Sequence, residues 1–213
     1  MKLTTADHLA LGMVAGTSLF TGALYSRLPD SVPTHFNIHG VADGWMNREI
    51  GAWLLPATCL GVWLLLRFGA LILPRGWKER MMASPTAAVG AIIAALLCAL
   101  QGVVLYAAIA KPPTVAITLG ALFGAFWIVL GLVMPRVRRN PWMGVRTAWT
   151  LSSDENWART HRIAGYAFVA AGVLAVVAVA AGFAWAAPAL IIVSAVVPMV
   201  YSFFLARHLP PSS

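Results

Sequence analysis

Long blocks of apolar residues, separated by short polar segments, make up most of the chain. A helix that crosses the hydrocarbon core of a membrane needs roughly 17–25 mostly apolar residues. Six blocks have about this length, and their continuous apolar runs favour helices over the alternating strands of a membrane barrel. The pattern predicts an all-α integral membrane protein whose six transmembrane helices cover residues 9–25, 50–73, 87–110, 114–134, 163–185 and 187–206.

The composition excludes an ordinary soluble protein. Of the 213 residues, 60% are hydrophobic and 10% are charged, whereas a soluble domain carries roughly 25% charged residues. Too few polar side chains remain to cover a surface that faces water. The first apolar block also has features of a signal peptide, but five more spans follow it, so we expect it to stay uncleaved as the first span.

The basic residues predict the orientation of the spans, because membrane proteins concentrate Lys and Arg in cytoplasmic segments. With six spans and a cytoplasmic N-terminus, twelve of the fifteen Lys and Arg residues fall at cytoplasmic ends. We therefore expect both termini in the cytoplasm, and we attribute the net charge of +8 to topology rather than to direct nucleic-acid binding. The twelve residues are Lys2, Arg67, Arg75, Lys78, Arg80, Arg136, Arg138, Arg139, Arg146, Arg159, Arg162 and Arg207.

The spans divide into two groups of three within a single membrane domain. Residues 1–110 hold three spans and a long polar segment, 27–49, that is predicted to lie outside the cell. Residues 111–213 hold the other three spans and a long polar segment, 135–162, that is predicted to lie inside. The two groups would have opposite orientations in the membrane, which suggests a three-plus-three inverted repeat of the kind common in transporters.

The outer polar segment contains "LPDSVPTHFNIHGVADGW" at residues 28–45. Its prolines disfavour a long helix, and we expect turns at His39-Gly40 and at Asp43-Gly44. Before the first turn, a spacing of four places His35 and His39 on one face of a strand or of a helical turn.

This outer segment has three interpretations. The first is a metal site formed by His35, His39 and Asp43, since imidazole and carboxylate groups bind divalent ions such as zinc. The second is a recognition surface, in which a strand would place Asn37 beside the histidines and would turn Phe36 and Ile38 to the other face. The third is a structural role for the histidines within the loop.

The inner polar segment contains "NPWMGVRTAWTLSSDENWARTHRIAG" at residues 140–165. Ser152 and Glu155 fit a capping box, so we expect Ser152 to cap a helix that continues into the fifth span. On this helix Trp157 and His161 would share one face. The segment is interpreted either as a packed loop that seals the helix bundle or as a docking site for a cytosolic partner.

Together, the two polar segments resemble the signatures of the SdpI-type immunity proteins, a bacterial membrane family. The family implies a multi-pass protein of the bacterial plasma membrane that protects a cell from a secreted toxin peptide, the sporulation-delay killing factor. It also implies signalling, in which a cytosolic repressor is held at the membrane. Ala148 departs from the proline that the family carries after Arg-Thr.

The resemblance assigns roles to residues by position. For recognition of a toxin peptide outside the cell, the signature residues are Pro33, His35, Phe36, Asn37, Gly40 and Asp43, and His39 joins them although it is not a signature position. For docking of a cytosolic partner, they are Asn140, Gly144, Arg146, Thr147, Trp149, Thr150, Trp157, Thr160, His161 and Arg162.

The predicted function is therefore immunity and signal transduction, with an extracellular toxin peptide, a cytosolic repressor and membrane lipid as partners. A small-solute transporter and a metal-binding membrane protein are the alternatives. We expect no enzymatic activity, because the candidate groups of the two polar segments would be separated by about 30 Å of hydrocarbon. No cofactor is expected apart from the divalent metal of the alternative interpretation.

Overall fold

Six long helices form the body of the protein in the computed structural model, which describes residues 3–208, so that Lys2 lies outside the described residues. Each helix is long and apolar enough to cross a membrane. This confirms the all-α, multi-pass architecture predicted from the hydrophobic blocks. The six helices are α1 (Thr5–Leu24), α2 (Arg48–Phe68), α4 (Thr86–Ala110), α5 (Ala116–Val133), α7 (Asp154–Ala180) and α8 (Ala186–His208).

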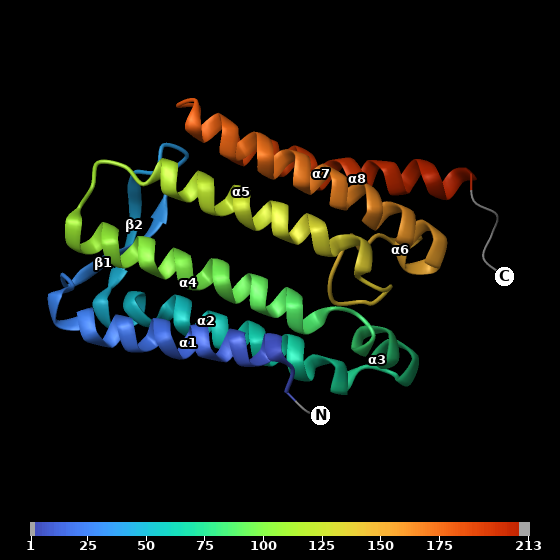
Figure 1. Cartoon of the computed structure of the whole chain (residues 1–213), viewed down its shortest axis with the longest axis horizontal. Coiled ribbons are helices and arrows are strands. Elements are labelled where there is room, and N and C mark those ends of the chain that lie inside the picture. The colour runs from blue at the N-terminus through green and yellow to red at the C-terminus, as the bar shows by residue number, and fades with distance from the viewer. Residues whose placement is uncertain (1–2, 209–213) are drawn as a thin grey trace.

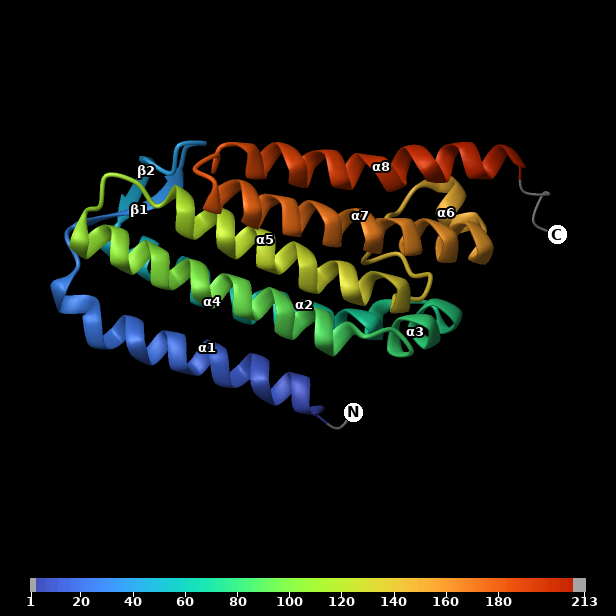
Figure 2. The same cartoon turned by 45° about the horizontal axis from the view of Figure 1, so that its top comes forward.

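The helices run side by side, and both ends of the chain lie at the same end of the bundle (Figures 1 and 2). We call this the terminal end, and the opposite end, which carries the two strands, the hairpin end. In the first group, α4 packs against both α1 and α2, whereas in the second group α7 packs against both α5 and α8. The helix with the most extensive contacts to its two partners is therefore the third span of one group and the second span of the other. The inverted repeat stays a prediction.

Short elements at the terminal end were not expected from the hydrophobic pattern. The segment after the second span contains helix α3 (Arg75–Met82), and the inner polar segment contains helix α6 (Ala148–Ser152). The 3-10 turns η2 (Gly69–Ile72) and η3 (Met134–Arg136) extend α2 and α5 at this end, whereas η1 (Tyr25–Arg27) extends α1 at the hairpin end.

The predicted cap of the helix leading into the fifth span is wrong by one residue. Ser153, not Ser152, precedes α7, and its hydroxyl accepts a hydrogen bond from the Asn156 N–H. Ser152 is the last residue of α6 and donates instead to the Trp149 carbonyl oxygen. Ser152 is not available as a cap because it belongs to the preceding helix α6. That helix has its own cap, Thr147, which forms reciprocal hydrogen bonds with Thr150.

An antiparallel hairpin of strands β1 (Ser31–Phe36) and β2 (Ala42–Asn47) forms the outer polar segment. The predicted turn at residues 38–40 is present, but Asp43 and Gly44 lie within β2, so the second predicted turn is wrong. Gly44 pairs with His35 at an irregularity in the register. A Cβ on Gly44 would lie 2.8 Å from the His35 Cβ, so this glycine serves a close cross-strand contact rather than a turn.

A proline inside α2 explains a buried glutamine in the first group of spans. Pro56 has no N–H to donate, so it leaves the carbonyl oxygen of Ala52, four residues earlier, without its helical partner. The fully buried Gln101 of α4 donates to this oxygen at 2.8 Å and to the Thr21 hydroxyl of α1 at 3.1 Å. One polar side chain therefore links all three helices within the apolar region.

Candidate functional site

The polar face of the hairpin is built around one pair of side chains. The ring Nδ1 of His35 lies within hydrogen-bond distance of the Asp43 carboxylate, and both side chains are exposed. The bulged register brings them together across the strands although eight residues separate them in the sequence. The predicted proximity of Asp43 to His35 is therefore observed.

The turn that follows β1 places His39 differently. The Asn37 side-chain oxygen accepts hydrogen bonds from the N–H groups of His39 and Val41, which fixes the turn. His39 is exposed, and its carbonyl oxygen accepts a hydrogen bond from the Thr114 hydroxyl at 2.6 Å. Among residues 3–208, no group of three or more His, Cys, Asp or Glu side chains is placed to hold a metal ion. The structure thus brings His35 and Asp43 together without adding His39 as a third ligand.

The tip of the hairpin is attached to the second group of spans. The Val115 N–H, just before α5, donates to the Gly40 carbonyl oxygen at 2.9 Å. Gly40 has a φ of +68°, and a Cβ there would lie 2.2 Å from the Ala116 backbone nitrogen. The hairpin therefore begins in the first half of the chain and rests on the start of α5 in the second half.

An apolar cavity of about 310 Å³ lies beneath this tip, between the hairpin, α5 and α8. Phe36, Asn37, Ile38 and Gly40 line it from the hairpin. Three of these four belong to the predicted recognition set; Ile38, which is 64% exposed, does not. The helices contribute lining residues that the motif did not indicate, because they come from other spans: Ala116, Leu119, Gly120, Phe123, Ala187, Pro188, Ile191 and Ile192.

At the terminal end, His161 joins the inner polar segment to α7. Its Nδ1–H donates to the Trp157 carbonyl oxygen at 2.9 Å, and its Nε2 accepts from the Val145 N–H at 3.1 Å. Each ring nitrogen therefore has a distinct role, which requires the hydrogen to be on Nδ1. The ring also stacks on Trp157, with centroids 4.0 Å apart.

Several signature residues of this segment serve its internal structure. The Trp157 indole donates to the Val137 carbonyl oxygen at 2.7 Å, and the Asn140 side chain accepts from the N–H groups of Trp142 and Met143. Five members of the predicted docking set are buried, namely Asn140, Thr150, Trp157, Thr160 and His161. Gly144, Arg146 and Arg162 are exposed, whereas Thr147 and Trp149 are partly exposed. The charged side chains of this set are therefore at the surface, at Arg146 and Arg162.

The same segment also holds α8 against α7. The Trp149 indole donates to the Ser202 hydroxyl at 2.6 Å, and the buried Asn156 amide donates to the Ser202 carbonyl oxygen at 3.0 Å. The Thr160 hydroxyl donates in turn to the Asn156 side-chain oxygen at 3.0 Å. The signature thus fastens the last two spans together at the terminal end.

Two arginines converge on one carboxylate beside this segment. Arg80 of α3 and Arg139 each reach both oxygens of Asp154, the first residue of α7. The hydrogen bonds to Asp154 raise the pKa of Arg80, so its guanidinium stays charged at physiological pH. The bridge joins α3, which follows the first two spans, to the start of the fifth.

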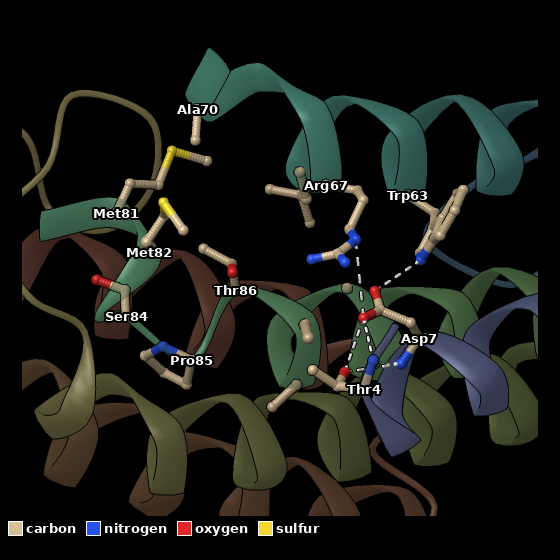
Figure 3. Close-up of a pocket in the computed structure, with 14 residues that line it drawn as sticks. Thr4, Asp7, Trp63, Arg67, Ala70, Met81, Met82, Ser84, Pro85 and Thr86 are labelled. Carbon is tan, nitrogen blue, oxygen red and sulfur yellow. Dashed lines mark hydrogen bonds and ion pairs between the residues drawn. The ribbon is translucent and has the colours of Figure 1, made fainter. Parts of the chain in front are cut away.

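A second polar cluster, which sequence analysis did not predict, lies at the terminal end between α1, α2, α3 and α4 (Figure 3). The buried Asp7 carboxylate accepts from the Thr4 N–H and hydroxyl, both at 2.8 Å, and from the Trp63 indole at 3.1 Å. Arg67 lies 3.9 Å from the same carboxylate, beside a cavity of about 290 Å³. The sequence contained one signal for this cluster. Asp7 begins the first span and Arg67 ends the second, so antiparallel packing of the two spans would bring the acid and the base together.

Comparison with known families assigns two regions of the chain. Residues 136–202 match the SdpI/YfhL protein family, and residues 12–60 match a domain of unknown function, DUF1648. No curated protein and no solved structure matches the chain. The first region contains the whole inner signature, and the second contains the outer one. The matches confirm the resemblance found in the sequence, since residues 136–202 form an SdpI-type region within a multi-pass membrane protein.

Proposed function

We propose that this protein gives resistance to a hydrophobic antimicrobial peptide that it recognises at the hairpin end. The observation that carries the proposal is the apolar cavity beneath the hairpin tip, which Phe36 and Ile38 line from one side and α5 and α8 line from the other. A hydrophobic peptide collects near the membrane surface. A cavity with apolar walls and a few oriented polar groups suits such a ligand.

The polar groups of the hairpin would give this site its selectivity. His35 and Asp43 are exposed and paired, so they can exchange their mutual hydrogen bond for contacts with a peptide backbone. Asn37 already uses its side-chain oxygen within the turn, so it shapes the site rather than reaching out. Among the residues assigned to recognition, Asn37 would therefore shape the site, and His35 and Asp43 would contact the ligand.

Signalling to the cytoplasm completes the proposal. The hairpin tip is hydrogen-bonded to the start of α5, and α5 packs along α7, whose first residues belong to the inner segment. Peptide binding beneath the tip would shift a conformation only if the peptide bound one arrangement of these helices better than another. The exposed Arg146 and Arg162 would then present a changed surface to a cytosolic repressor.

Survival of a toxin-sensitive bacterium tests the first step. Cells that express the wild-type protein are challenged with the killing-factor peptide, beside cells that express Ile38→Ser or the matched control Val41→Ser. Both positions are exposed residues of the hairpin turn region, but Val41 does not line the cavity beneath the tip. We expect wild type and Val41→Ser to protect and Ile38→Ser to lose protection at equal membrane abundance. Equal protection by all three proteins would place recognition elsewhere.

A further inference from the structure

The surface around the Arg80–Asp154–Arg139 bridge is hollowed into a groove of about 830 Å³. The groove runs between the end of α3, the segment after α5 and the start of α7. Four arginines and one aspartate line it, which gives a net charge of +3: Arg80, Arg136, Arg138, Arg139 and Asp154. We call this the arginine groove.

The arginines of the groove fall into two kinds. Arg80 and Arg139 form ion pairs with Asp154, and each donates two hydrogen bonds to its carboxylate. Within residues 3–208, the Arg138 side chain has no hydrogen bond or ion pair, and the Arg136 side chain donates one hydrogen bond, to the Leu132 carbonyl oxygen, and forms no ion pair. The groove therefore presents two arginines whose charge no carboxylate balances.

The position of the groove defines the depth at which a ligand would bind. The fourth span ends at Arg136, and the fifth begins at Asp154. The groove thus lies where the apolar helices end, at the level of the lipid headgroups on the terminal side. A phosphate at this level belongs to a membrane lipid, and a guanidinium can donate two parallel hydrogen bonds to its oxygens.

We propose that the arginine groove is a specific binding site for the phosphate headgroup of an anionic membrane lipid, held by Arg136 and Arg138. Lipid binding at this groove would be independent of peptide resistance at the hairpin end. Since Arg80 and Asp154 join the two halves of the chain along the same groove, a bound lipid would also strengthen the contact between them. The Arg139 guanidinium also stacks over the Trp77 ring, with its central carbon 5.7 Å from the ring centroid. This cation–π contact makes the wall of the groove more rigid.

Lipid titration of the full-length protein in neutral detergent tests this site. Short-chain phosphatidylglycerol and phosphatidylcholine are added separately, and the apparent Kd is read from the rise in Tm. The groove variant is Arg136→Gln/Arg138→Gln. The control variant, Arg75→Gln/Arg159→Gln, removes the same charge from exposed helix positions at the same end, where each arginine pairs with a glutamate four residues away.

We expect wild type and control to bind phosphatidylglycerol more tightly than phosphatidylcholine. The groove variant should bind phosphatidylglycerol more weakly by about fivefold for each arginine removed. An equal loss in both variants would overturn the proposal, because it would indicate general attraction to the basic end. Preference of the groove for a soluble polyglutamate peptide over phosphatidylglycerol would overturn it as well, because the occupant would then be an acidic protein segment.

Discussion

Gly144 and His161, seventeen positions apart, pack so closely that a Cβ on the glycine would lie 2.2 Å from the histidine Nε2. The same Nε2 accepts a hydrogen bond from the next residue, Val145. Within the inner signature, the absence of a side chain at Gly144 therefore leaves the space that the His161 ring requires. This contact fixes the inner segment on α7.

Substitution of Gly144 by alanine should destabilise the protein strongly. The glycine has a φ of +104°, which a residue with a side chain rarely adopts, and the added methyl group would meet the buried ring. Backbone strain alone costs about 1–3 kcal/mol. Gly76→Ala in α3 is the control, because nothing lies within 4 Å of its Cβ position. Thermal unfolding in detergent measures both, and equal Tm values would contradict the packing described here.

Replacement of His161 by alanine should lower the free energy of unfolding by about 3 kcal/mol. The change leaves the Val145 N–H without its acceptor, which costs about 1–3 kcal/mol, and also opens a cavity beside Trp157. His39→Ala, at an exposed position, should change the stability by less than about 0.5 kcal/mol. Chemical denaturation monitored by tryptophan fluorescence can distinguish the two. A mild effect at His161 would mean that the loop is held by other contacts.

Gln101→Leu should destabilise the first group of spans, and a second substitution should reverse part of the loss. The leucine cannot donate to the Ala52 carbonyl oxygen that Pro56 leaves unpaired. In Gln101→Leu/Pro56→Ala, the new N–H at position 56 can pair with that oxygen within the helix. We therefore expect the double variant to have a higher Tm than Gln101→Leu alone. If Pro56→Ala lowers Tm equally in the wild type and in Gln101→Leu, the glutamine does not act through this carbonyl group.

The Arg80–Asp154 pair should couple the two halves of the chain by a measurable free energy. Both side chains are partly exposed, at 40% and 61%, so solvent screening limits the interaction to about 1 kcal/mol. A double-mutant cycle with Arg80→Gln and Asp154→Asn measures this coupling. The cycle should be repeated in Arg139→Gln, where Asp154 has one arginine fewer and the coupling should rise. A coupling free energy near zero in both the wild type and Arg139→Gln would show that the bridge does not stabilise the contact between the halves.

The spans were predictable because hydrocarbon imposes a length and an apolar composition on every crossing helix. Predicted and observed ends agree within a few residues except at the fifth span, which begins at Asp154 rather than at residue 163. There the helix continues beyond the apolar block, and its polar first turns were predicted correctly as a helical extension. The cap was misplaced because Ser152, but not Ser153, has a glutamate three residues later, whereas in the structure Ser152 ends α6 and Ser153 caps α7.

The number of spans, the two polar segments and the family signatures could all be read from the sequence, since each depends on composition or on short spacings. Tertiary structure decided which signature residues are accessible, because the burial of Asn140 or His161 depends on contacts with distant segments. It also decided the cavity beneath the hairpin tip and the arginine groove. Each combines segments that are far apart in the chain, and only the folded arrangement brings their walls together.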